Sequence, residues 1–381
     1  MFTEWHDMPH RAAPTGSMNR RDFLRLGGAG LAGAVLLGAA GGKVLARPGS
    51  LLKAEFAAAA AKYEVPKELL MAMGYVNTLW EMPAPESSDY EPGDLHGRGA
   101  YGLMQLLRNP SRDTLGRAAS LTGLSEKELK SDRAANVRGG AAVLADIQGA
   151  NRPAELNGWQ EAVAEYGDTQ LYAVEVYETL KNGASAAIST GESLRLAPQR
   201  GVEVPQIYTA QGSADYRRAV WRPAHRSNYT NDNRRARQID KIVIHVAQGS
   251  FSGTVNWFQN PAADVSAHYV VGTKGGLAQC VHNEDIAWHA GHWKTNTRCI
   301  GIEHAGYVGN PRWFTKRMYR TSARLSAYLC RKYRIPVDRR YIIGHHEVPG
   351  CPGAGGGISC HTDPGRHWDW RRYMRLIKRY R

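Results

Sequence analysis

The residue pattern of this chain changes near residue 186, and this change constrains the fold more than any other feature. Residues 51–185 are predicted to be largely helical, whereas residues 214–381 alternate strand-like and helix-like stretches. Because 381 residues are enough for two hydrophobic cores, we expect two domains. The segment 186–213 has no clear period and is predicted to be a linker.

The first half contains several stretches of helical length. Pro66 suits the start of a helix, because its missing N–H would be unpaired there anyway. The loop 81–102 is rich in proline, glycine and acidic residues. We therefore predict an all-α domain over 51–185. The helical stretches are 54–65, 69–80, 135–147 and 159–167.

The second half interleaves strands with helices. The residues TKGG (273–276) join two strand-like runs and predict a hairpin with a glycine turn. Residues 318–333 carry apolar side chains at helical spacing. This order predicts an α/β domain over 214–381, with a mixed sheet flanked by helices. The strand-like runs are IVIH (242–245), AHYVV (267–271), LAQCV (277–281), CIGIEHAG (299–306) and YIIGH (341–345).

Three side chains of the second half form a set that zinc favours. His245 ends one strand-like run, His345 lies in GHHEV (344–348), and Asp363 lies in HTDPG (361–365). Zinc takes imidazole and carboxylate ligands in tetrahedral geometry, and a catalytic zinc site keeps three protein ligands with a fourth position for water. Spacing alone does not link these three residues, so the assignment depends on the flanking sequence.

That flanking sequence resembles the type 2 N-acetylmuramoyl-L-alanine amidases, which share their zinc-dependent fold with peptidoglycan-recognition proteins. The resemblance covers 214–381, with every motif in the expected order. It implies cleavage of the amide between the muramic lactyl group and L-alanine, with peptidoglycan (glycan strand plus stem peptide) as partner and Zn²⁺ as cofactor. The matching segments are KIVIH, VSAHYVV, IAWHAG, CIGIEHAG, YIIGHHEV and HTDPG followed by WDW.

The resemblance also implies roles for single residues. His245, His345 and Asp363 are the expected zinc ligands. Glu303 matches the family's acid/base carboxylate, so we expect it to act as a general base and then as proton donor to the leaving amine. His361 matches a position where the family carries Lys or His, and we expect it to donate a hydrogen bond to the developing oxyanion.

Neighbouring side chains have two interpretations each. His268 and His289 either contact substrate or orient buried backbone. Trp288 and Trp293 either line a groove for the glycan and peptide or belong to the core. Three further residues beside the key positions are expected to face elsewhere or to support the ligands. These are His304, His346 and Glu347.

Residues 51–185 resemble the lysozyme-like domain of soluble lytic transglycosylases. The matching segments are LLMAMGYV, GAYGLMQL (99–106), ANVRGG and WQEAVAEYG. Family members carry Glu-Ser at the end of the first of these helices, where this chain has Asn77-Thr78. An amide cannot protonate a leaving oxygen, and Glu81 lies one helical turn later. We therefore expect a domain without glycosidase activity that binds glycan, or one that is only structural.

The start of the chain predicts export. MNRRDFLRL (18–26) carries paired arginines, and the stretch 27–42 is apolar and uncharged but short for a membrane span. The small residues of VLA (44–46) suit a cleavage site. We interpret 1–46 as a twin-arginine signal, the alternative being a basic tail beside an anchor. The mature protein is then expected outside the cytoplasm, in the cell wall or periplasm, without a stable membrane span.

Cysteine usage and charge complete the expectations. In an oxidising compartment Cys351 and Cys360 could close their glycine-rich loop as a disulfide, and at least one of the other three thiols stays unpaired. The net charge of +14 predicts attraction to a polyanion. Anionic wall polymers fit an exported protein better than nucleic acid does. The rival functions are peptidoglycan recognition without cleavage and a bifunctional hydrolase that also cuts glycan.

Overall fold

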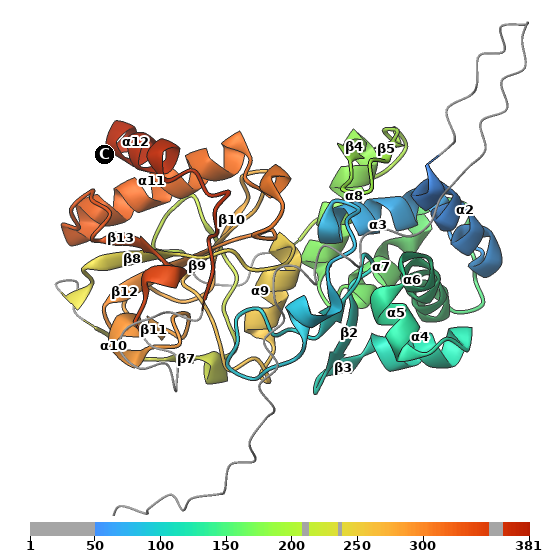
Figure 1. Ribbon diagram of the computed structural model, residues 1–381, viewed down its shortest axis with the longest axis horizontal. Helices are drawn as coiled ribbons and strands as arrows, with labels where there is room; N and C mark the ends of the chain where they lie inside the picture. The colour runs from blue at the N-terminus through green and yellow to red at the C-terminus, as the bar shows by residue number, and fades with distance from the viewer. Residues whose placement is uncertain (1–49, 208–212, 235–237, 350–360) are drawn as a thin grey trace, which may run out of the picture. The chain divides into compact units, whose positions relative to one another are not determined.

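The computed structural model describes residues 50–207, 213–234, 238–349 and 361–381 (Figure 1). The predicted export signal and the predicted Cys351–Cys360 disulfide lie outside these residues. Residues Gly49–Arg381 form one compact unit. Within it we call 50–207 the helical half and 213–381 the sheet half.

Helices of the helical half begin at side chains that cap their first N–H groups. Ser50, Asp113 and Thr169 each accept such a hydrogen bond, and Ser125 forms a capping box with Glu128. The helices predicted at 54–65, 69–80, 135–147 and 159–167 are present with shifted ends. The observed helices are α2 (Leu51–Tyr63), α3 (Lys67–Thr78), α4 (Thr114–Thr122), α5 (Glu126–Ser131), α6 (Arg133–Gln148), α7 (Gln160–Tyr166) and α8 (Gln170–Asn182), with 3-10 turns η1 (Pro85–Ser88) and η2 (Leu156–Trp159).

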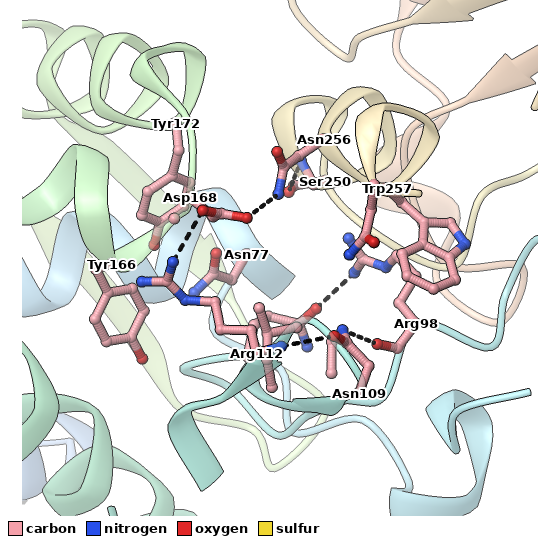
Figure 2. A pocket seen from close by; sticks show the side chains of 16 residues that line it. Asn77, Arg98, Asn109, Arg112, Tyr166, Asp168, Tyr172, Ser250, Asn256 and Trp257 are labelled. Atoms are coloured by element: carbon pink, nitrogen blue, oxygen red, sulfur yellow. Dashed lines mark hydrogen bonds and ion pairs between the residues drawn. The ribbon is translucent and has the colours of Figure 1, made fainter. Parts of the chain in front are cut away.

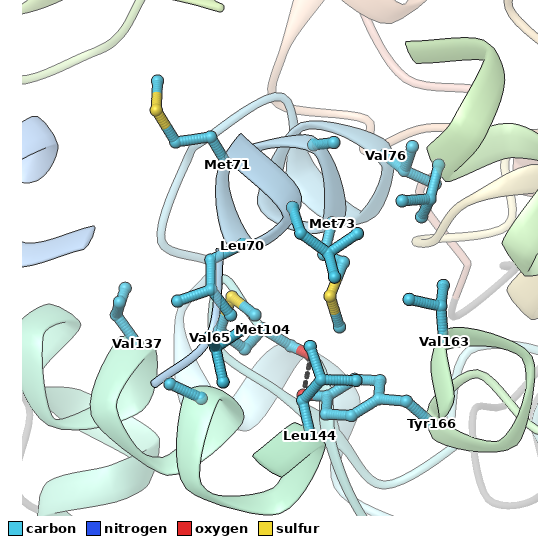
Figure 3. Packing of buried hydrophobic residues seen from close by; sticks show 14 of the residues in the cluster. Val65, Leu70, Met71, Met73, Val76, Met104, Val137, Leu144, Val163 and Tyr166 are labelled. Atoms are coloured by element: carbon cyan, nitrogen blue, oxygen red, sulfur yellow. Dashed lines mark hydrogen bonds between the residues drawn. The ribbon is translucent and has the colours of Figure 1, made fainter. Parts of the chain in front are cut away.

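One hydrophobic core joins these helices (Figure 3). The glycine pair of the ANVRGG segment permits close packing: a Cβ on Gly139 would lie 2.7 Å from Leu129, and one on Gly140 would lie 2.6 Å from Met104. The buried Tyr166 hydroxyl donates to the Met104 carbonyl oxygen at 2.8 Å, so the polar atom is satisfied inside the core.

The helical half also contains short strands, so it is not all-α as predicted. The antiparallel sheet β1-β2-β3 follows the proline-rich loop, and a hairpin of β4 and β5 follows α8. That hairpin falls where a linker was expected from residue 186. Its Leu194 and Leu196 are buried in the core of the helical half, which explains why the segment is ordered. The strands are β1 (Ala100–Tyr101), β2 (Leu106–Asn109), β3 (Arg112–Asp113), β4 (Ala184–Ala187) and β5 (Ser193–Leu196).

The sheet half contains the predicted mixed sheet, in the order β13-β8-β12-β9-β10-β6. The neighbours β13, β8, β12 and β9 are parallel, β9 and β10 form the predicted antiparallel hairpin, and β6 adds in parallel to β10. The strands are β6 (Val220–Trp221), β8 (Lys241–Ile244), β9 (Tyr269–Val271), β10 (Leu277–Gln279), β12 (Cys299–His304) and β13 (Ile342–Gly344); β7 (Tyr229–Thr230) pairs separately with β11 (Ile286–Ala287).

Helices cover the sheet because its side chains are apolar on both faces. Ile242 and Ile244 pack toward α11 (Lys316–Tyr333) and α12 (Trp370–Tyr380), which lie together on one face (Figure 1). Val270 belongs to a second cluster with α9 (Phe251–Gln259). The remaining elements are α10 (Trp293–Asn296), η3 (Arg226–Asn228), η5 (Pro311–Trp313) and η6 (His345–Glu347).

Among the residues that the structure describes, no helix is long and apolar enough to span a bilayer. The three described cysteines, Cys280, Cys299 and Cys330, are buried free thiols. Burial raises the pKa of Cys280 and of Cys299 to about 12, so both behave as apolar core residues.

Candidate active site

Three parallel strands bring the key side chains to one edge of the sheet. His245 follows β8, Glu303 lies near the end of β12, and His345 follows β13. The register pairs Ile244 with both Ile302 and Gly344, so the three strands end at the same level. The carboxyl ends of parallel strands are where α/β folds assemble sites.

Asp363 arrives from the loop before α12 and is held beside these strand ends. Its carbonyl oxygen accepts the backbone N–H of His346 at 3.0 Å, and its Oδ2 accepts the N–H of Val246 at 3.3 Å. Candidate ligand atoms of His245, His345 and Asp363 all lie within 4.8 Å of one another. The structure thus converges the three residues that were singled out from separated motifs, and we call them the ligand triad.

The contacts inside the triad are short and buried. The Nδ1 atom of His345 lies 3.1 Å from Asp363 Oδ1, and the Nδ1 atom of His245 lies 3.4 Å from Asp363 Oδ2. All three side chains are at most 1% exposed. Burial opposes ionisation of Asp363, but the imidazoles of His345 and His245 outweigh burial and hold its pKa well below the ordinary value.

His245 is kept as a neutral imidazole, the form that binds metals. Burial and the nearby His345 lower the pKa of His245 to about 3. Its Nε2 lies 3.1 Å from Nδ1 of the buried His289. If Nε2 donates there, Nδ1 keeps its lone pair directed at the triad. His289 therefore contacts a ligand side chain, a role that neither of its two interpretations included.

A glycine in β12 makes room for this arrangement. A Cβ on Gly301 would lie 2.5 Å from the ring of His289. The backbone N–H groups of His289 and Ala290 are fixed by the Asn296 side chain, at 3.2 and 2.9 Å. The glycine of the CIGIEHAG motif thus permits the His289 ring to press against the strand.

Glu303 is a buried carboxylate beside the triad. It is fully buried, with Oε1 3.8 Å from Nδ1 of His245. Neither carboxylate oxygen accepts a hydrogen bond of normal geometry from the described residues. Burial and the charge of Asp363 raise the pKa of Glu303 well above its ordinary value. An unsatisfied buried acid of this kind is typical of sites that move protons.

His361 contacts one member of the ligand triad. Its ring stacks on that of His345, with centroids 3.6 Å apart and planes 15° apart. It is half-buried, and burial together with His345 lowers its pKa to about 4. His304, which follows Glu303 in β12, has its ring between the carbonyl oxygen of His245 and the Ser322 hydroxyl, at 2.8 and 2.7 Å.

The structure separates the remaining candidates. His268 is fully buried: Arg234 approaches its Nε2 at 2.8 Å, and Gly301 donates its N–H to Nδ1 at 3.0 Å. It orients buried backbone and offers no surface to a substrate. Trp288 is partly buried and donates to Thr230 Oγ1 at 3.0 Å. Trp293, at the start of α10, is 57% exposed.

Sequence reasoning missed a contribution from the helical half. The loop 89–98 brings Asp94 and His96 beside the site, where the ring of His96 meets the ring of His361 edge-on at 6.5 Å between centroids. A histidine inside the predicted loop 81–102 was visible in the sequence. Nothing in its local pattern indicated a tertiary contact with a different domain.

The position that matches the catalytic acid of lytic transglycosylases holds an asparagine beside a small cavity (Figure 2). Asn77, at the end of α3, is buried and lines a cavity of about 60 Å³ whose opposite wall includes Asn256 and Trp257 of α9. One water takes about 10–15 Å³ of such volume, so the cavity holds a few waters. Arg112 and Asn256 reach Asp168 across it, at 2.9 and 3.4 Å.

Glu81 does not replace the missing acid, because its carboxylate is already engaged. Its oxygens accept from the N–H and hydroxyl of Ser189, at 3.0 and 2.6 Å, and from Arg312 at 2.9 Å. The side chain thus clamps the β4–β5 hairpin and the sheet half to the end of α3. A carboxylate held by three donors is a structural group.

Comparisons with known proteins relate the sheet half to one family of enzymes. Residues 235–366 match the family model described as N-acetylmuramoyl-L-alanine amidase. N-acetylmuramoyl-L-alanine amidase A of Achromobacter lyticus is 31% identical over 182 residues, which cover 43% of this chain and 96% of that relative. The 1,6-anhydro-N-acetylmuramyl-L-alanine amidase AmpD of Haemophilus influenzae is 33% identical over 121 residues, which cover 30% of this chain and 59% of that relative. The crystal structure of a selenomethionine AmpD derivative is 25% identical in sequence, with a TM-score of 0.31, and the match covers 42% of this chain and 94% of that one.

Strand-end imidazoles and carboxylates on a helix-flanked mixed sheet define an amidase of type 2, and the chain belongs to the N-acetylmuramoyl-L-alanine amidase family. It hydrolyses the amide bond between N-acetylmuramic acid and L-alanine in peptidoglycan. The predictions of an enzyme and of this substrate bond are confirmed.

Proposed function

We propose that this hydrolysis depends on a zinc ion held by His245, His345 and Asp363. The observation that carries the proposal is the convergence of their ligand atoms within 4.8 Å at a buried strand edge. The chemistry of the set fits, because neutral imidazoles and one carboxylate are common zinc ligands, and three of them leave a position open. When bound, zinc activates a water and polarises the substrate carbonyl oxygen.

We assign the proton transfers to Glu303. Its carboxylate lies next to the triad and has no competing hydrogen bond of normal geometry among the described residues. It takes the proton of the attacking water and returns it to the leaving amine, which otherwise departs as an unstable anion. This sequence restores Glu303 to its starting form.

We assign stabilisation of the developing oxyanion to His361. The half-buried ring stacks on that of His345 and is more exposed than the three proposed ligands, so it is the imidazole of the site best placed to meet a substrate oxygen. A preorganised donor at this point stabilises charge that appears only in the transition state. Gly291 lies close to His361, since a Cβ added to this glycine would be 3.7 Å from His361 Nε2. Trp293, two residues later, is exposed, and we assign it to contact with the glycan and stem peptide.

We infer that the helical half is a lysozyme-like domain without glycosidase chemistry. Asn77 occupies the position of the family acid, Glu81 is engaged, and the cavity at Asn77 is too small for a sugar strand. A glycan-binding role for this half would have to use another surface. The twin-arginine signal over 1–46 and attachment of the +14 chain to anionic wall polymers belong to the same proposal, which places the enzyme in the cell envelope.

The direct test combines zinc content with product analysis. Purified protein carrying one zinc per chain should release stem peptides with a free L-alanine amino group from sacculi. A chelator should stop the release, and added zinc should restore it. Release that continues after complete zinc removal would contradict the metal mechanism.

A further inference from the structure

The loop 89–98 of the helical half is built into the sheet half. Leu95 is buried in the same apolar cluster as Val255 and Trp257 of α9. The N–H of Gly93 donates to the Ala263 carbonyl oxygen at 3.2 Å. Tyr90 donates to the Ala262 carbonyl oxygen at 3.2 Å, and its ring meets that of Trp257 edge-on. The loop is therefore fixed relative to the amidase core.

A buried arginine fixes the end of this loop against the segments that leave the active-site strands. Arg98 is 6% exposed and donates to Gln105 at 2.8 Å. A Cβ on Gly249 or Gly253 would lie 2.6 or 2.2 Å from its guanidinium, so both glycines make room for the arginine in its observed position. Gly249 in turn exchanges two backbone hydrogen bonds with Gly306, just beyond Glu303.

Between these anchors the loop presents one histidine to the site. The carboxylate of Asp94 accepts the backbone N–H of His96 at 2.8 Å and lies 3.9 Å from its Nδ1. The His96 side chain is 19% exposed, and its Nε2 is buried without a hydrogen-bond partner among the described residues. A buried nitrogen in this state is costly unless something in the site bonds to it.

His96 and Asp94 also interact electrostatically with groups of the site. After burial and His345, His96 contributes to the lowered pKa of His361. After burial and Asp363, Asp94 contributes to the raised pKa of Glu303. The edge-on contact of His96 with His361, whose ring stacks on that of His345, puts the His96 ring beside the ligand triad.

We propose that His96 is a substrate-binding residue of the amidase site, with its free imidazole nitrogen bonding to a polar group of the muramyl peptide beside the scissile amide. The inference rests on the proposed function of that site. It means that the helical half serves the amide chemistry through a loop outside the 235–366 stretch that matches the family model.

The test uses the full-length protein with a soluble N-acetylmuramoyl peptide. His96→Ala should raise KM and lower kcat/KM about tenfold, the loss expected for one hydrogen bond, while kcat changes little. Zinc should stay at one equivalent and the melting temperature unchanged. His96→Gln, which keeps a polar group, should recover part of the loss, and His225→Ala, an exposed histidine elsewhere, should match wild type.

Binding to an inactive background gives a second readout. Isothermal titration should show the muramyl peptide binding about tenfold more weakly to Glu303→Gln/His96→Ala than to Glu303→Gln alone. Equal KM and equal affinity would overturn the proposal, as would loss of zinc in His96→Ala. If wild type itself releases no L-alanine ends, the function fails. If wild type and His96→Ala are equally active, only the role of His96 fails.

Discussion

The strand-end site of the sheet half and the end of α3 in the helical half treat their polar groups in opposite ways. At the sheet edge, two imidazoles and two carboxylates converge in a buried site, and Glu303 has no hydrogen bond of normal geometry from the described residues. In the helical half, Asn77 donates to a carbonyl oxygen and Glu81 is held by three donors. Unsatisfied groups that converge indicate chemistry, whereas satisfied groups indicate scaffold.

The largest expected effect comes from breaking the triad. His345→Ala should abolish stoichiometric zinc binding and lower amide cleavage by at least about 10³-fold, because metal catalysis supplies several kcal/mol. Zinc analysis and peptide release measure it. A variant that keeps both zinc and activity would remove the main difference between the halves.

Glu303→Gln tests the proton carrier separately from the metal. Its kcat should fall by about 10²–10⁴-fold, since an amide cannot shuttle the proton, while zinc content stays at one per chain. Steady-state kinetics with parallel zinc analysis decides the point. Wild-type kcat in this variant would assign the proton transfers to another group.

The helical half should respond through stability. Phe56 is fully buried in its core, so Phe56→Ala should lower the free energy of unfolding by about 3–5 kcal/mol without changing zinc stoichiometry in the folded protein. Denaturant titration measures the loss. A change below about 1 kcal/mol would mean that this core collapses around the truncation.

Glu192 gives a smaller effect with a defined pH dependence. Burial opposes its ionisation, but hydrogen bonds from Leu52, Arg133, Ser50 and Thr190 outweigh burial and lower its pKa to about 2. The contribution of ionised Glu192 to the free energy of unfolding is therefore complete above its ordinary pKa, and it disappears as the pH falls toward 2. Glu192→Gln should cost about 1–2 kcal/mol at pH 7. Unfolding curves of the two proteins should converge in acid; a constant difference would contradict this.

The smallest effect is expected where the lytic-transglycosylase acid is missing. Asn77→Glu restores a carboxyl group, but the cavity of about 60 Å³ facing α9 admits only waters, so no glycan cleavage should appear. Reducing-end and anhydro-sugar assays on sacculi check this. New glycan ends would show that the helical half keeps an accessible cleft.

Much of the sheet half follows from local sequence. Runs of buried β-branched residues predicted its strands, and three motif residues predicted the ligand triad that the structure brings together. Two kinds of feature could not be predicted from the sequence. The hairpin β4–β5 lacks a clear period, and it forms because Leu194 and Leu196 find a tertiary core.

The sequence also could not predict residue roles that depend on tertiary contacts. His268 and His289 looked alike in sequence, and only their contacts with Arg234 and His245 show that one orients backbone and the other a ligand. His96 lies in a loop whose position depends on Leu95 entering a core formed by distant residues. Sequence patterns report periodicity and chemistry, but they do not report which distant surfaces meet.

The central claim is that one half carries the bond-breaking chemistry. Mass spectrometry of peptidoglycan digested by the zinc-loaded, full-length enzyme tests it directly, because it distinguishes amide from glycosidic cleavage in one sample. We expect intact glycan strands and free stem peptides beginning with L-alanine. New reducing ends or anhydro-muramic products, or stem peptides still attached to muramic acid, would contradict it.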